Sequence, residues 1–228
     1  MPVWRPVASA QCDPETVFLP EERVGAGDFP SGVALGDVSG DSVLDLVLAN
    51  DLSDDLSVLL GVGDGTFEPE QRVAVGDQPT GVAIADINGD GFADLVSANV
   101  LGNDVSVRLG RGDGTFEDER RFSTGPGPAG PAIGDLNGDG HADIVTANAS
   151  SNDASVLLGR GDGAFEPEQR VGAGARPFDV ALADVDGDGV LDLLVANATG
   201  GDVSVRLGLG DGGFGPDTRA PAGRGVSS

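Results

Sequence analysis

The chain has 228 residues, and 38 Asp and Glu against 13 Lys and Arg give it a formal charge of −25. Because nucleic acid is anionic, we do not expect it among the partners. We expect no membrane insertion either, because no stretch approaches the roughly 18 consecutive apolar residues that a transmembrane helix needs. A single cysteine, Cys12, excludes an intramolecular disulfide framework. Hydrophobic residues make up 39%, enough for a packed core, and 38 Gly with 14 Pro indicate many tight turns. The composition therefore predicts a compact, turn-rich β protein.

A strict internal repeat organises the chain. Four Asp-rich turns open 49 residues apart, at Asp37, Asp86, Asp135 and Asp184. Phenylalanines recur with the same spacing, at Phe18, Phe67, Phe116, Phe165 and Phe214. Self-similarity at a fixed period of this size is typical of repeat architectures in which each copy is one supersecondary unit.

Each copy contains four strand-sized runs. In the second copy they cover residues 81–85, 93–98, 104–109 and 116–123, and no segment shows apolar residues at helical spacing. A four-stranded antiparallel unit of this length cannot bury both of its faces alone and must stack on its neighbours. The predicted fold is therefore all-β, a β-propeller of four 49-residue, four-stranded antiparallel blades, with the apolar first run innermost and the polar fourth run at the outer edge.

The repeat also predicts the domain organisation. The blades cover about 29–76, 78–125, 127–174 and 176–223, and residues 18–27 form one extra outer strand. Together, residues 18–223 form a single propeller-repeat domain. We expect residues 1–17 to be a flexible N-terminus and residues 224–228 a C-terminal tail.

The Asp-rich turn between the first and second strands has the pattern D-x-[DN]-x-D-G-x-x-D in three copies. A hard divalent cation with six to eight oxygen ligands needs alternating side chains from one tight loop, a backbone carbonyl and a closing carboxylate. We predict Ca²⁺ ligands at positions one, three, five and nine and a carbonyl ligand at position seven. In chain order these residues are Asp37, Ser39, Asp41, Val43, Asp45, Asp86, Asn88, Asp90, Phe92, Asp94, Asp135, Asn137, Asp139, His141, Asp143, Asp184, Asp186, Asp188, Val190 and Asp192.

Other readings of these loops fit less well. An EF-hand needs Glu at position twelve and flanking helices, whereas position twelve is Ser97 in the second loop. Zinc and copper prefer His or Cys, and Mg²⁺ rarely occupies a cage made only of protein ligands. Plain Asp/Asn/Gly turns remain the structural alternative, although so many carboxylates at constant spacing would repel one another without a cation. We expect up to four Ca²⁺, with the weakest site at 37–45, where Ser39 and Ser42 replace a ligand and the turn glycine.

No residue is assigned a catalytic role. His141 is the one histidine, and because it stands at the carbonyl position of its loop we expect its imidazole to point to solvent. The tripeptide Arg-Gly-Asp occurs at 111–113 and 160–162, but Val62 and Leu209 stand at the position of its arginine in the other copies. We interpret it as part of the repeat hairpin rather than as an adhesion motif.

The repeat resembles the FG-GAP/VCBS family, the integrin-α-like propeller repeats. The resemblance rests on Gly134-Asp-Leu-Asn-Gly-Asp-Gly-His-Ala-Asp143, on Val145-Thr-Ala-Asn148 and on Leu158-Gly-Arg-Gly-Asp-Gly-Ala-Phe165, and it extends over about residues 18–223. It implies structural Ca²⁺ in the second to fourth loops and an extracellular or cell-surface location. Propellers of that integrin type have seven blades whereas this chain has four, so we expect an open arc, with a closed four-bladed ring as the alternative.

The functional expectation is a calcium-binding module for extracellular binding or adhesion. Its partner would be a protein or carbohydrate ligand, and self-association could complete the propeller. A carbohydrate-active propeller enzyme, such as a polysaccharide lyase or hydrolase, is one alternative, and a structural spacer without a ligand is another.

Overall fold

The computed structural model describes residues 23–221, in which the chain forms four antiparallel sheets and no helix. Sheet 1 contains β1 (Pro30–Gly36), β2 (Asp45–Asn50), β3 (Asp55–Leu59) and β4 (Gln71–Ala74). Sheet 2 contains β5 (Pro79–Ala85), β6 (Asp94–Asn99), β7 (Asp104–Arg108) and β8 (Arg120–Ser123). Sheet 3 contains β9 (Pro128–Gly134), β10 (Asp143–Asn148), β11 (Asp153–Leu157) and β12 (Gln169–Gly172). Sheet 4 contains β13 (Pro177–Ala183), β14 (Asp192–Asn197), β15 (Asp202–Arg206) and β16 (Thr218–Pro221).

The all-β fold and the four-stranded blades predicted from the repeat are confirmed. Strands in each sheet follow chain order, as in β1-β2-β3-β4. The fourth strand is shorter than expected: in sheet 2 it begins at Arg120, because Phe116 forms an isolated bridge with Gly110 that closes the preceding turn. The predicted segments 1–17 and 224–228, and most of the extra strand 18–27, lie outside the described residues.

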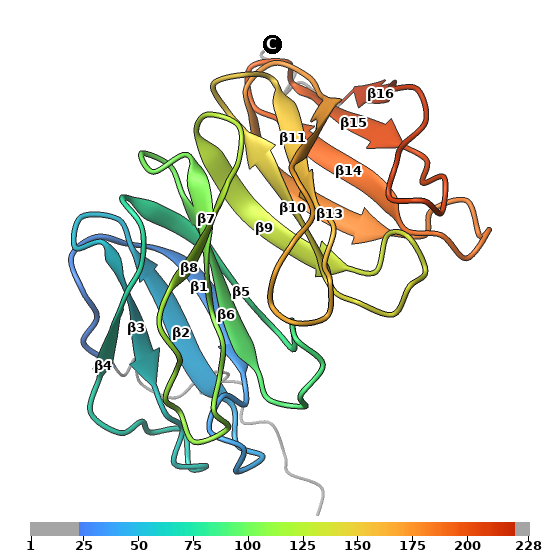
Figure 1. Ribbon diagram of the computed structural model, residues 1–228. Coiled ribbons are helices and arrows are strands. Elements are labelled where there is room, and N and C mark those ends of the chain that lie inside the picture. The colour runs from blue at the N-terminus through green and yellow to red at the C-terminus, as the bar shows by residue number, and fades with distance from the viewer. Residues whose placement is uncertain (1–22, 222–228) are drawn as a thin grey trace, which may run out of the picture.

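The sheets form an open arc. The first strands lie innermost, with β1 against β5, β5 against β9 and β9 against β13. Among the described strands β13 does not pack closely against β1, so sheets 1 and 4 occupy opposite ends of the arc (Figure 1). The open arc expected from the blade number is thus found, and the closed four-bladed ring is not. No described helix has the length and apolarity that a membrane crossing needs.

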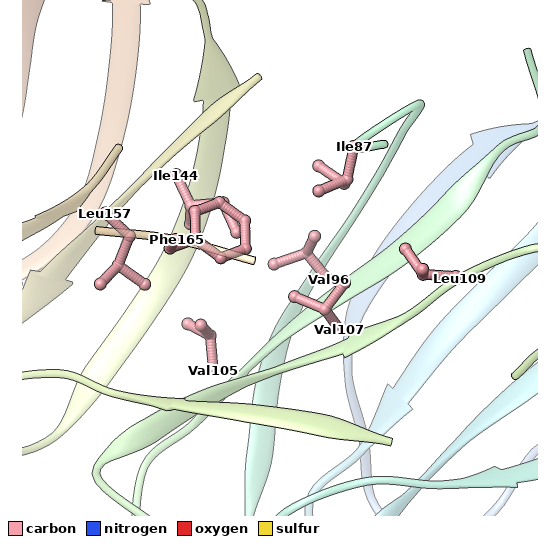
Figure 2. Packing of buried hydrophobic residues seen from close by; sticks show 8 residues of the cluster. All are labelled: Ile87, Val96, Val105, Val107, Leu109, Ile144, Leu157 and Phe165. Carbon is pink, nitrogen blue, oxygen red and sulfur yellow. The ribbon is translucent and has the colours of Figure 1, made fainter. Parts of the chain in front are cut away.

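The core lies between successive sheets. We call the side of a sheet that meets the following sheet its leading face, and the side that meets the preceding sheet its trailing face. Between sheets 2 and 3, Val96 and Val107 on the leading face of sheet 2 meet Ile144 and Phe165 on the trailing face of sheet 3 (Figure 2). Each fully buried side chain of this size contributes about 1.5–3 kcal/mol. Stacking of neighbouring sheets is therefore what stabilises each blade.

A buried polar network closes the opposite end of each sheet from the Asp-rich loops. In sheet 3, the Asn148 side-chain amide donates to Asp153 and to the Ser155 hydroxyl, both at 2.8 Å. The Ser155 hydroxyl in turn donates to Glu168, and Arg170 pairs with Asp153. The side chains of these residues thus bond one another and join strands two, three and four.

Candidate metal centre

The first Asp of each nine-residue loop folds the loop around its own carboxylate. In the second loop, Asp86 Oδ1 accepts the amide of Gly89 at 2.7 Å, and Oδ2 accepts the amide of Gly91 at 2.9 Å. Both glycines have positive φ, 75° and 87°, which an L side chain adopts only with strain. The loop therefore owes its tight path to one carboxylate and two glycines.

The third and fifth side chains lie next to each other. Asn88 Nδ2 lies 2.8 Å from Asp90 Oδ2, and Asp90 Oδ1 accepts the amide of Phe92 at 2.9 Å. In the third loop the backbone amide of His141, followed by the Asn137 side chain, lowers the pKa of Asp139. The Asp139 carboxylate is thus held in its ionised form, in which its oxygens can act as ligands.

In the fourth loop, three of the predicted ligands converge. Carboxylate oxygens of Asp184, Asp186 and Asp188 lie within 4.8 Å of one another, and all three residues are exposed. The donors are oxygens only, which suits a hard cation such as Ca²⁺. Positions one, three and five therefore fit the predicted ion in this loop.

The ninth residue has different surroundings. Asp143 is fully buried, and its two oxygens accept the backbone amides of Leu136 at 2.8 Å and Gly159 at 2.7 Å. The same pair of bonds recurs in all four loops, at Asp45, Asp94, Asp143 and Asp192. This carboxylate fastens the loop to the end of the third strand, a role that the sequence analysis missed.

Burial also changes the acidity of the ninth residue. Desolvation raises the pKa of Asp94 and of Asp143, and the backbone amides offset only part of that effect. In the second loop the charges of Asp90 and Asp86 raise it further. A carboxylate has about four acceptor positions, so two amide bonds leave capacity for an ion. The ligand role of the ninth residue stays a prediction.

The seventh residue was predicted to act through its carbonyl, and the structure shows what its side chain does. Phe92 lies over Gly112, where an added Cβ would come within 2.2 Å of the ring, and His141 lies over Gly161 in the same way. The His141 side chain is exposed, as expected, but it covers the Arg-Gly-Asp turn of its own blade. These turns therefore need glycine, which explains the Gly of both Arg-Gly-Asp tripeptides as part of the fold.

The first loop folds like the others despite its two serines. Asp37 accepts the amides of Gly40 at 2.7 Å and Ser42 at 2.8 Å, and the bond from Ser42 lowers the pKa of Asp37 most. Ser42 takes a φ of 69° where the other loops have glycine. Ser39 offers only a hydroxyl at position three, so this loop has fewer anionic oxygens than the fourth.

Two surface grooves lie at equivalent positions between neighbouring sheets. The first, of about 370 Å³, is lined by residues that include Arg72, Arg108 and Phe116. The second, of about 350 Å³, is lined by the residues Arg121, Phe122, Ser123, Leu157, Arg160, Phe165, Glu166, Pro167 and Glu168. Each groove combines side chains that are about 40 residues apart in the sequence. No local sequence motif therefore predicts it.

The family follows from the repeated loop and its sheet. The model of the FG-GAP-like repeat matches residues 37–97, 86–146 and 135–195. The chain belongs to the FG-GAP-like repeat family. No curated protein matches the sequence.

Solved structures place the chain among propeller-like folds. It is similar to an Agrocybe aegerita lectin that recognises non-reducing terminal N-acetylglucosamine, with 26% identity, a TM-score of 0.55 and coverage of 81% of this chain and 50% of the lectin. A Bacteroides uniformis protein assigned as a 6-phosphogluconolactonase shows 17% identity, a TM-score of 0.62 and coverage of 84% and 57%. A Lactobacillus plantarum protein shows 14% identity, a TM-score of 0.57 and coverage of 87% and 57%. The chain thus spans only about half the length of these proteins.

Proposed function

We propose that the chain is a calcium-stabilised propeller module that binds carbohydrate outside the cell and has no catalytic step. The observation that carries the proposal is the convergence of Asp184, Asp186 and Asp188 in a loop that repeats every 49 residues. Bound Ca²⁺ would neutralise exposed like charges and fix each hairpin between the first and second strands. Positions one, three and five would hold the ion, with the predicted carbonyl and ninth carboxylate completing the shell.

An extracellular location is part of the same proposal. Extracellular calcium modules bind with dissociation constants of about 10⁻⁴–10⁻³ M, which suits the free calcium outside cells. Exposed loops that lack a Glu at position twelve suit such modest affinity better than the tighter calcium binding of a cytosolic sensor. The first loop, with Ser39 in place of an acid or amide, would bind last.

Thermal unfolding with and without calcium tests the metal. At a free calcium concentration about 1,000 times the dissociation constant, one site that binds only the folded state contributes about 4 kcal/mol. We expect the melting temperature to fall by many degrees in excess EGTA and to recover with Ca²⁺ but not with an equal concentration of Mg²⁺. An unchanged melt in excess EGTA would contradict the calcium assignment.

A carbohydrate is favoured over a protein ligand by two observations. The lectin likeness reaches 26% identity, and the second groove presents polar groups beside apolar rings. Among the lining residues, Arg160 pairs with Glu166 at 2.8 Å, and the rings of Phe122 and Phe165 meet edge to face with their centroids 4.8 Å apart. Sugars are bound by such planar polar groups next to apolar surface.

A glycan array in the presence of Ca²⁺, followed by calorimetry, tests the ligand. Oligosaccharides ending in N-acetylglucosamine are the first probe. We expect Arg160→Ala to weaken binding at least tenfold, since Arg160 lines the groove. Arg111→Ala is the matched control, because Arg111 holds the same repeat position and is not among the lining residues of either groove.

Both arginines are exposed, and exposed ion pairs add only about 0–1 kcal/mol, so the two variants should fold equally well. Absence of binding to every glycan would refute the carbohydrate part and leave the calcium part to its own test. Equal loss in the two variants would move the binding site away from the groove.

A further inference from the structure

The two ends of the arc expose faces that are buried at every internal joint. On the leading face, Val38 and Ile87 are 1% and 2% exposed, whereas their equivalent in sheet 4, Val185, is 50% exposed. On the trailing face, Val82 and Ile84 of sheet 2 pack against the core of sheet 1, whereas their equivalents Val33 and Leu35 in sheet 1 are 63% and 61% exposed.

These two open faces match each other as the internal faces do. The leading face of sheet 4 consists of Val185, Leu194, Val203, Val205 and Leu207. The trailing face of sheet 1 consists of Val33, Leu35, Leu44, Leu46 and Leu48. Leading faces of this composition meet trailing faces of this composition in all three clusters of the core. The partner that each face fits best is therefore the other face, presented by a second copy.

The outer strand of sheet 4 departs from the pattern of the internal sheets. In sheet 3, short hydrogen bonds join the Asn of the second strand, the Ser of the third strand and the acidic residue of the outer strand. Ser155 lies 2.5 Å from Glu168 in this network. In sheet 4, Ser204 lies 3.4 Å from the shorter Asp217, and the pair Arg219–Asp202 is 3.6 Å long. These two side-chain contacts are therefore longer in sheet 4, whereas the backbone ladder of β15 and β16 has four pairs as in sheet 3.

Residues 18–27 repeat the sequence pattern of an outer strand, with Glu21 where the last copy has Asp217. Phe18, Glu21 and Arg23 repeat the spacing of Phe165, Glu168 and Arg170. The amide of Gly27 donates to Ser57 Oγ at 3.1 Å, as the amide of Gly76 donates to Ser106 Oγ at 3.0 Å after the outer strand of sheet 1. The described chain thus begins with the same amide-to-hydroxyl bond that links sheet 1 to sheet 2.

We propose that two copies of the chain pair head to tail into a closed ring. The leading face of sheet 4 in each copy lies on the trailing face of sheet 1 in the other. Two sets of four sheets give eight blades, within the range of about four to eight that propellers use. A head-to-tail contact that closes in this way leaves no open face for further growth.

One residue prevents the joint between two copies from packing as closely as the joints between sheets of one chain. At Gly32 and at Gly81 an added Cβ would lie 2.8 Å from the inner strand of the next sheet. Asp179 holds the same position in sheet 4 and is exposed. The joint between copies must therefore open slightly at the inner strands, and removal of this side chain should tighten it.

Charge gives the pairing a distinct salt dependence. Each copy has a formal charge of −25, so the copies repel each other, while the joint itself is apolar apart from Asp179. Added salt screens that repulsion, with a Debye length of about 10 Å at 0.1 M and 3 Å at 1 M. Pairing should strengthen with salt, opposite to an interface made of ion pairs.

Light scattering coupled to gel filtration, over a range of protein and salt concentrations with Ca²⁺ present, tests the pairing. We expect twice the 22.8 kDa mass of one chain, with the paired fraction rising with salt. Asp179→Gly should lower the concentration needed for pairing several-fold. A single-chain mass at every concentration overturns the proposal, and a mass that grows beyond two chains overturns the closed ring.

Two charged variants test the faces. Leu35→Glu and Leu207→Glu place a charge on the trailing face of sheet 1 and the leading face of sheet 4, and each should give a single-chain mass. Mixing the two variants restores one intact joint, so the mixture should form pairs that neither variant forms alone. Leu101→Glu is the control, because Leu101 is 69% exposed in a hairpin away from both faces.

All three leucines are more than 40% exposed, so the variants should fold, and circular dichroism of each checks this. Pairing that survives both face variants, or that is lost equally in the control, contradicts the proposed surfaces.

Discussion

The two ends of the nine-residue loop use aspartate for different purposes. The ninth carboxylate, as in Asp143, is buried and accepts the backbone amides of Leu136 and Gly159. Carboxylates at positions one, three and five, as in Asp184, Asp186 and Asp188, are exposed and converge. The comparison indicates that one end of the loop builds the blade, whereas the other end is the part that we propose binds the ion. It also gives each end a distinct signature in stability measurements.

The largest expected effect is at the buried end. In EGTA, Asp143→Ala should lower the free energy of unfolding by about 3 kcal/mol or more, because the buried amides of Leu136 and Gly159 lose their acceptor. Urea denaturation measures it. Asp139→Ala, in the exposed part of the same loop, is the control and should cost less than about 1 kcal/mol. Equal losses would remove the distinction between the two ends.

The next effect is at the exposed end and should appear only with calcium. Asp188→Ala removes one of the three converging carboxylates of the fourth loop. We expect calorimetric titration to show one Ca²⁺ fewer, or binding at least tenfold weaker at one site, with the melting temperature in EGTA unchanged. Asp186→Asn, which recreates the second and third loops, should keep the site. Loss of stability in EGTA would show that Asp188 is structural as well.

A smaller effect is expected from the backbone of the first loop. Ser42 has a φ of 69°, a conformation that favours glycine. Ser42→Gly should raise the free energy of unfolding by up to about 1 kcal/mol, measured by urea denaturation in EGTA. The reciprocal variant Gly91→Ser, at the equivalent position of the second loop, should lower it by a similar amount. Changes of the same sign would exclude backbone strain as the cause.

The smallest effect on stability is expected from Ser39. Ser39→Asp supplies the carboxylate that the fourth loop has at the same position, so the first loop should bind Ca²⁺ several-fold more tightly in a calorimetric titration. Because the side chain lies at the exposed end, the melting temperature in EGTA should stay the same within error. Unchanged calcium binding would mean that position three does not limit this loop.

Much of the fold could be predicted because each blade repeats its own local signals. Proline and Asp-rich turns bound the strands, so the predicted run 104–109 matches β7 (Asp104–Arg108) closely. The fourth strand was predicted to begin too early, since Phe116 is apolar like a strand residue but serves a turn bridge. Its backbone partner Gly110 is close in sequence, yet residue types alone do not distinguish an isolated β-bridge from a longer run of paired strand residues.

The candidate site could likewise be predicted only in part. Spacing alone identified the loop and its exposed carboxylates, because tight loops bring neighbouring side chains together whatever the rest of the chain does. The role of Asp143 depends on Gly159, at the end of another strand. The groove around Arg160 likewise depends on two sheets being stacked. Such partners are set by packing between distant segments, so the sequence pattern could not reveal them.

By itself the sequence determined the composition, the 49-residue repeat, the all-β blades and the position of four acidic loops, because turn chemistry and alternation act over a few residues. Only the tertiary structure decided that the blades form an open arc, that one Asp of each loop is buried, and that matching apolar faces stay exposed at the two ends. Those properties follow from how whole sheets stack, and stacking depends on surfaces assembled from strands far apart in the chain.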